Sequence, residues 1–215
     1  MAGLLEKDIR LIWGNRQSLL LFFALAVVLG FSQDGTFILG YFPFVIIILI
    51  INNTIAYDEL DNGFQFLMTL PINAKTYVRE KYIFSFAGGI VSWLISATLY
   101  FAAKIVHGTQ LDVISELPVI VTFLPIIILM AAFMIPVQIK FGVEKSRAVV
   151  AGICGAIGAC ILIFAKFSGQ NGKNIFAFLD HMNGWVIVGI GIVLTAVITA
   201  ISYIISVKIM KKKEF

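Results

Sequence analysis

The chain has 215 residues, of which 60% are hydrophobic and only 13% are charged, and its mean hydropathy is +0.99. A soluble domain usually carries about 25% charged residues, so a water-soluble enzyme of this size and a disordered protein are both excluded. The length allows roughly six spans of about 20 residues with short connections. The composition therefore predicts an all-α polytopic membrane protein, with a single transmembrane domain over residues 1–215.

Residues 1–16 predict an amphipathic helix that lies in the membrane interface. At about 100° per residue its apolar side chains share one face, while Glu6, Lys7 and Arg10 share the other. The apolar face consists of Leu5, Ile9, Ile12 and Trp13. Charged residues precede the first apolar run and no small-residue cleavage site follows it, so the segment is not a cleavable signal peptide. A simple extension of the first span into water is the alternative.

Hydropathy predicts six membrane-spanning helices. They cover approximately residues 18–31, 37–56, 82–103, 117–140, 148–165 and 185–207. The first is short for a hydrocarbon core of about 30 Å, but Arg16 at its start can reach the interface.

The basic residues predict the orientation of these spans. Thirteen Lys and Arg residues fall in the N-terminal segment, the second-to-third and fourth-to-fifth connections and the C-terminus. Only Lys104, Lys166 and Lys173 fall on the opposite side. The positive-inside rule therefore predicts that both termini are cytoplasmic. This asymmetry accounts for the net charge of +4 without a nucleic-acid partner.

The sequence predicts no catalytic, cofactor-binding or metal site. The two histidines, His107 and His181, lie alone in predicted outer loops. The glycine-containing segment 169–174 lacks the spacing and the terminal Ser or Thr of a phosphate-binding loop. We therefore expect that the chain is not an enzyme and that any ATP-driven work requires another subunit.

A ridge of small residues in the predicted fifth span indicates a helix-packing surface. Ala151, Gly155 and Ala159 are spaced four apart and lie on one helix face. Such ridges allow close helix approach in lipid. Packing within the bundle is the favoured interpretation, and an interface with another subunit is the second.

Residues 57–81, the predicted second-to-third connection, have more internal organisation than the other connections. They contain three acidic residues, a short helix with an apolar face, a Leu-Pro stop and a lysine. These residues are Asp58, Glu59 and Asp61; Phe64, Leu67 and Met68; Leu70 and Pro71; and Lys75. A short helix with an apolar face outside the membrane needs a docking surface. The residues alone leave the chain's own bundle and a cytoplasmic partner equally open.

This connection resembles that of ABC-2 type transporter permeases. The likeness rests on the acidic end of the second span, the short helix, and Leu70-Pro71 followed by Lys75 and Lys81. It implies that residues 57–81 form a coupling connector that docks on a separate ATPase subunit, which alone binds ATP and Mg²⁺. It also implies a second permease subunit, in a homo- or heterodimer. The nine residues just named for the connector would then be the ATPase-coupling residues.

The small size of the chain is similar to that of bacterial peptide-exporter permeases, which include bacteriocin-immunity and phenol-soluble modulin exporters. The similarity implies an exporter in the bacterial cell membrane that moves an amphipathic or antimicrobial-type peptide by alternating access. Two other functions stay open. One is the substrate-binding component of an energy-coupling-factor importer, and the other is an immunity or structural membrane protein that acts without an ATPase.

Overall fold

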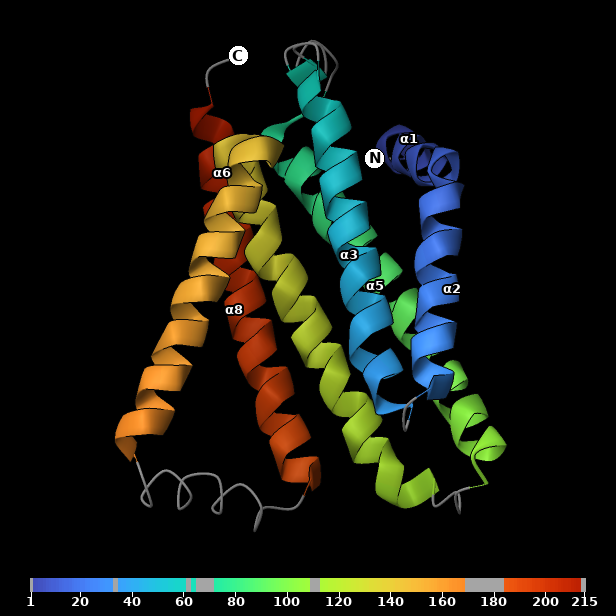
Figure 1. Ribbon diagram of the computed structural model, residues 1–215. Helices are drawn as coiled ribbons and strands as arrows, with labels where there is room; N and C mark the ends of the chain where they lie inside the picture. Colours follow the sequence, from blue (N-terminus) through green and yellow to red (C-terminus); the bar gives the residue numbers. More distant parts are fainter. Residues whose placement is uncertain are drawn as a thin grey trace.

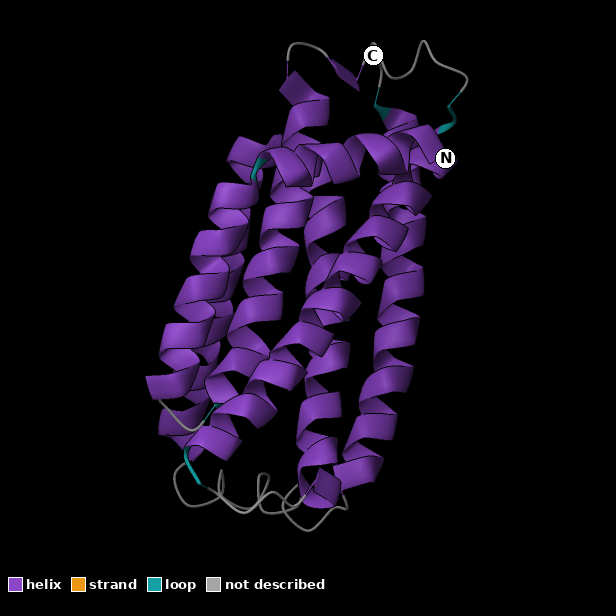
Figure 2. Cartoon of the chain, turned by 90° about the vertical axis from the view of Figure 1, so that its right-hand side faces the viewer, coloured by secondary structure: helices purple, strands orange, loops and turns teal. Residues whose placement is uncertain are grey.

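The computed structural model describes residues 2–32, 35–60, 63, 64, 72–108, 113–168 and 184–213. Its helices are α1 (Ala2–Gly14), α2 (Arg16–Ser32), α3 (Thr36–Glu59), α5 (Ala74–Val106), α6 (Val113–Ser168) and α8 (Gly184–Lys212). The long helices form one bundle, and α1 lies across one end of it (Figures 1 and 2). Both termini lie at this end, which we call the termini end (Figure 1).

Four helical segments are long and apolar enough to cross a membrane. They are Thr36–Glu59, Ala74–Val106, Val113–Gly142 and Gly184–Lys212. The bent pair formed by α1 and α2 makes a fifth candidate if it is counted as one broken span. The chain is thus an all-α multi-pass protein with four or five candidate spans among the described residues, and the number six stays a prediction.

The predicted break between the interfacial segment and the first span is present. Helix α1 ends at Gly14, α2 begins at Arg16, and the two helices meet at a 65° bend. The Ser18 hydroxyl donates to Asn15 Oδ1 at 2.8 Å, which holds the start of α2 against the turn. Ile9 and Trp13 are exposed on α1, by 55% and 72% of their surface. The position of α1 in the interface stays a prediction.

Helix α6 contains the reversal between the predicted fourth and fifth spans. The chain is helical from Val113 to Ser168 except at Gly142, where φ is 75° and ψ is 169°. Because glycine has no Cβ, it adopts this left-handed φ without strain, and one residue reverses the chain. The two arms of α6 meet at the termini end and diverge toward the opposite end (Figure 1).

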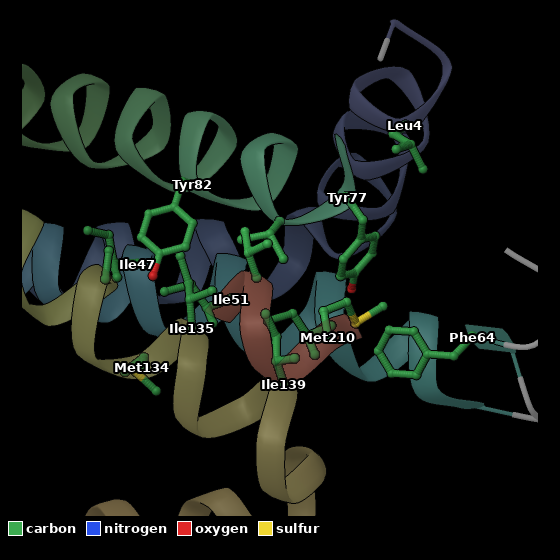
Figure 3. Packing of buried hydrophobic residues seen from close by; sticks show 14 of the residues in the cluster. Leu4, Ile47, Ile51, Phe64, Tyr77, Tyr82, Met134, Ile135, Ile139 and Met210 are labelled. Carbon is green, nitrogen blue, oxygen red and sulfur yellow. The ribbon is translucent and has the colours of Figure 1, made fainter. Parts of the chain in front are cut away.

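The largest apolar cluster lies toward the termini end and joins α3, α5, α8 and the first arm of α6 (Figure 3). Ile47, Ile51, Tyr77, Ile135 and Met210 are among its members. These side chains recur every three or four residues along their helices, so one face of each helix enters the core. This end of the bundle is therefore the best packed part of the apolar core.

Hydroxyl groups add polar links between the helices. The Tyr82 hydroxyl lies 2.7 Å from Ser202 Oγ and 3.0 Å from Ser206 Oγ, which joins α5 to α8. At the opposite end, the Tyr100 hydroxyl donates to Glu116 Oε2 at 2.5 Å and Lys104 pairs with the same carboxylate. Helix α5 is thus tied to its neighbours near both of its ends.

Candidate functional site

A buried cluster of charged side chains joins α1, α3 and α5 at the termini end. The Lys81 ammonium of α5 lies 2.5 Å from Asp8 Oδ2 of α1 and 2.8 Å from Asp58 Oδ2 of α3. Asp8 is fully buried, and Lys81 and Asp58 are 1% and 4% exposed. One cation therefore bridges carboxylates on two other helices.

Two further side chains complete the coordination of Asp58. Lys7 forms an ion pair with Asp58 Oδ1 and lies 3.3 Å from Asp8 Oδ1. The Tyr77 hydroxyl donates to Asp58 Oδ2 at 2.9 Å, and the Lys81 ammonium lies 5.3 Å from the centroid of the Tyr77 ring. We call Lys7, Asp8, Asp58, Tyr77 and Lys81 the α1–α3–α5 charge cluster.

The energetics of burial explain why these groups are held together. Charges removed from water lose hydration, so they persist in a folded chain only when they are paired and hydrogen-bonded. Breaking such a buried pair by removing one partner typically costs about 3–5 kcal/mol. Because α1 supplies Asp8 and Lys7, the cluster holds α1 against α3 and α5, and moving α1 away would break these buried ion pairs.

Glu80 lies next to the cluster, but its carboxylate has fewer polar partners than those of Asp8 and Asp58. It is 1% exposed, and its Oε2 lies 3.7 Å from the Lys81 ammonium. Neither of its carboxylate oxygens accepts a hydrogen bond from the described residues. The buried carboxylates at this site, Asp8, Asp58 and Glu80, thus outnumber the two lysines. The described residues contain no group of three or more His, Cys, Asp or Glu side chains placed to hold a metal ion.

Three residues of the cluster lie where α3 ends and α5 begins. Asp58 is in the last turn of α3, while Tyr77 and Lys81 lie four residues apart in the first turns of α5. That spacing puts Tyr77 and Lys81 on one face of α5. A displacement of the connector would therefore act first on the residues that hold α1, α3 and α5 together.

Phe64, in the connector, packs against the chain's own bundle. Its ring centroid lies 5.7 Å from that of Tyr77 in an edge-to-face arrangement, and only 6% of its surface is exposed. The Lys213 ammonium lies 4.5 Å from the Phe64 centroid. Burial lowers the pKa of Lys213, and the nearby charge of Glu59 opposes this effect. Figure 3 shows Phe64 beside Met210 at the edge of the core.

Glu59 connects the end of α3 to the reversal in α6. A Cβ atom added at Gly142 would overlap the Glu59 carboxylate. An added Cβ would displace the far end of the exposed Glu59 side chain, so the positive φ is the main reason for glycine at position 142. Glu59 therefore lies against the backbone at the start of the second arm of α6.

The structure buries two of the predicted coupling residues within this chain. Asp58 and Phe64 were expected to face a partner, but both are buried within this chain. Asp58 is paired with lysines of α1 and α5, and Phe64 packs edge-to-face against the fully buried ring of Tyr77. The sequence left two docking surfaces open for this segment. Phe64 docks on the first of them, the chain's own bundle.

The other predicted coupling residues are exposed or lie outside the described residues. Glu59 and Lys75 are exposed. The remaining five, which lie outside the described residues, are Asp61, Leu67, Met68, Leu70 and Pro71. Two apolar side chains that the sequence interpretation did not select, Tyr57 and Leu60, are exposed at the end of α3 by 54% and 57%.

The ridge of small residues is exposed at one end. Ala151 is exposed, and a Cβ added at Gly152 would meet nothing within 4 Å. At this end of the ridge the structure shows no packing partner among the described residues, and packing within the bundle stays a prediction. The side-chain surroundings of Gly155 and Ala159 lie outside what the structure describes. The exposed Ala151 is available for the second interpretation, an interface with another subunit.

Sequence reasoning missed the role of Asp8, although a signal for it was present. Leu4, Asp8 and Ile12 are spaced four apart, so the carboxylate lies on the helix face between two apolar side chains. An acidic residue in an apolar stripe indicates a buried partner. The identity of that partner, Lys81, required the tertiary structure.

Comparison with known proteins gives one family. A family model described as ABC-2 family transporter protein matches residues 3–211, nearly the whole chain. Neither the comparison with curated proteins nor that with solved structures finds a match.

Proposed function

The chain belongs to the ABC-2 family of transporter proteins, and from this premise we propose that it is the permease subunit of an ATP-binding-cassette exporter for an amphipathic or antimicrobial-type peptide. Members of this family are typically non-catalytic membrane subunits that pair with an ATPase subunit. In the proposal, the ATPase binds ATP and Mg²⁺ and docks at the termini end.

The observation that carries the proposal is the bridge from Lys81 to Asp8 and Asp58, where α3 ends and α5 begins. A push on the connector reaches three helices through this bridge, and packed helices move as rigid bodies. ATP-driven closure of the partner is thereby converted into a joint displacement of α1, α3 and α5. Alternating access requires this kind of concerted movement.

The docking surface that we propose uses the exposed residues of the connector. Tyr57 and Leu60 supply apolar area, while Glu59 and Lys75 supply charge around it. A central apolar contact surrounded by polar groups is the usual anatomy of a protein interface. Residues 61, 62 and 65–71 would extend this surface in the proposed coupling helix.

A second permease subunit completes the pathway in this proposal. The exposed ridge at Ala151 provides a surface for it, since small residues permit close helix contact in lipid. The peptide substrate is supported by the 19 phenylalanines of the chain, which would give the pathway the apolar, aromatic lining that an amphipathic peptide needs. Cytoplasmic termini place the docking surface on the side where ATP is present.

The proposal is tested by copurification with a candidate ATP-binding-cassette ATPase, followed by measurement of ATP hydrolysis and peptide efflux in proteoliposomes. Leu60→Asp is the informative variant, because it puts a charge into the proposed interface. A truncated or charged anchor at an interface often costs about 2 kcal/mol or more, so the ATPase should no longer coelute. Ile114→Asp is the matched control, because Ile114 is 77% exposed in the first turn of α6, and α6 begins at the opposite end of the bundle (Figure 1).

The results separate the possible functions. Efflux that depends on ATP and on Leu60 supports the exporter. Unchanged coelution, hydrolysis and efflux with Leu60→Asp would place the ATPase contact elsewhere. Binding of a vitamin or metal ion by the purified chain without efflux would instead favour an importer component.

A further inference from the structure

An apolar groove runs along the outside of the bundle between α2 and α5. Its volume is about 440 Å³, and α1 closes it at the termini end with Ile12. All of its lining side chains are apolar except that of Ser92. The Ser92 hydroxyl donates to the Gly89 carbonyl of its own helix at 2.9 Å, so it is already satisfied. The groove therefore offers no hydrogen-bonding group to an occupant.

The groove opens on the outer surface of the bundle and has about the length of one leaflet. Two of its lining side chains, Leu20 and Val91, are 64% and 57% exposed. On α5 the lining extends from Phe84 to Ile95, which at about 1.5 Å per residue corresponds to about 16 Å. The hydrocarbon core of a bilayer is about 30 Å thick, so one leaflet contributes about 15 Å. This match indicates an acyl chain that lies parallel to the helices.

A basic residue lies at the interface end of the same surface. Arg16 begins α2 and precedes the groove residues Leu20 and Phe23 by four and seven positions, which puts all three on one helix face. Arg16 is exposed, and no carboxylate within the described part of the chain pairs with it. Arg10, by contrast, is already bound to Glu6 at 2.6 Å.

The groove is apolar, and Arg16 lies exposed on the helix face that carries the groove residues Leu20 and Phe23, with no carboxylate partner in the described part of the chain. From these two features we infer that this site binds one anionic phospholipid of the leaflet on which α1 lies. One acyl chain fills the groove between α2 and α5, and the phosphate lies at Arg16. A methylene chain needs no hydrogen bonds, whereas an extended peptide would leave backbone groups unsatisfied in this lining. The bound lipid fills the space beside α1 and holds the α1–α2 bend against α5.

The inference is tested by native mass spectrometry. The full-length chain is solubilised in detergent and titrated with phosphatidylglycerol or with phosphatidylcholine. The wild type should bind one phosphatidylglycerol before any other lipid. Arg16→Gln should weaken this first binding about fivefold, because one basic residue near an anionic headgroup contributes about that factor. The binding of phosphatidylcholine should not change, and Arg10→Gln should behave as the wild type.

Val91→Trp tests the groove itself, because the larger ring occupies the space of the acyl chain. It should weaken the first binding event about tenfold or more. Leu94→Trp is the matched control, since Leu94 is 52% exposed on the same helix and does not line the groove. Ala87→Phe, a second filling variant in the groove, replaces Val91→Trp if circular dichroism shows that the latter is unfolded.

Three results would overturn the inference. One is equal lipid binding by the folded filling variant and the wild type. Another is an equal loss of binding in Leu94→Trp. The third is a wild-type dimer that Val91→Trp converts to a monomer, because the groove would then be a contact between protein chains. None of these measurements involves transport, so a failure here is distinguishable from a failure of the proposed exporter function.

Discussion

The Lys81 ammonium lies 2.5 Å from Asp8 Oδ2, although the two residues are 73 positions apart in the chain. Both side chains are almost completely buried, and Lys81 also reaches Asp58 at 2.8 Å. The amphipathic N-terminal helix is thus bound through charges to the helices on either side of the connector. Movements of the connector and of α1 are therefore coupled in the folded chain.

Removal of the bridging cation should strongly destabilise the bundle. Lys81→Met keeps most of the side-chain volume but leaves Asp8 and Asp58 with Lys7, which is partly exposed, as the remaining cation beside them. Removal of one partner from a buried ion pair typically costs about 3–5 kcal/mol, and the retained contact with Lys7 should put the loss toward the lower end of that range. Thermal unfolding in detergent measures the effect. Lys75→Met, on an exposed position of the same helix, should stay within about 0.5 kcal/mol of the wild type.

Neutralisation of the carboxylates as well should restore part of the lost stability. The combined variant Asp8→Asn, Asp58→Asn and Lys81→Met contains no unpaired charge among these three positions. If it is as unstable as Lys81→Met alone, the loss comes from side-chain packing and the buried charges do not cause it.

The reversal of α6 should require glycine at position 142. Gly142→Ala forces a residue with a Cβ into a φ of 75° and against the Glu59 carboxylate. Such strain costs on the order of 1–3 kcal/mol, so the midpoint of thermal unfolding should fall. Gly152→Ala is the control, because a Cβ there meets nothing within 4 Å and alanine favours the helix by roughly 0.5–1 kcal/mol.

Equal stabilities of these two variants would show that the reversal at position 142 tolerates a side chain. Gly142→Ala combined with Glu59→Ala separates the two contributions. The double variant removes the overlap with the carboxylate while it retains the backbone strain, so it should recover only part of the loss.

Both termini should lie on the cytoplasmic side of the membrane. The structure puts them at one end of the bundle (Figure 1), and the distribution of basic residues predicts which side this is. After replacement of Cys154 and Cys160, a cysteine added beyond Phe215 should not react with an impermeant thiol reagent in intact cells. Gly108→Cys, exposed at the opposite end, should react. The reverse labelling pattern would invert the topology.

Ala151→Leu should weaken association between chains and leave the isolated chain stable. Ala151 is exposed, so added bulk there displaces no side chain of its own bundle, whereas it would separate two closely packed helices. Size-exclusion chromatography with light scattering measures the oligomeric state. Ala24→Leu, at an exposed alanine of α2, is the control. A loss of stability in the monomeric Ala151→Leu chain would contradict the assignment of this ridge to a subunit interface.

The sequence by itself determined the class of the protein and the approximate positions of most helices. Long apolar runs leave few structural choices in a membrane, because every backbone polar group must be satisfied within its own helix. The break after Gly14 was also predictable, since a charged amphipathic segment and an apolar segment prefer different environments. Hydropathy placed a connection between the fourth and fifth spans but could not predict that one residue, Gly142, makes the reversal, because backbone dihedral angles do not show in an apolar pattern.

Only the tertiary structure decided which polar residues of the connector face inward. In sequence, Asp58 and Glu59 are adjacent acidic residues, but the helix turns them to different surroundings, so one meets Lys81 and the other meets the α6 reversal. Phe64 likewise belongs to the core because Tyr77 returns beside it. Periodicity specifies the face of a helix on which a side chain lies. The groups that lie opposite that face depend on contacts between residues distant in the chain, such as Asp8 and Lys81.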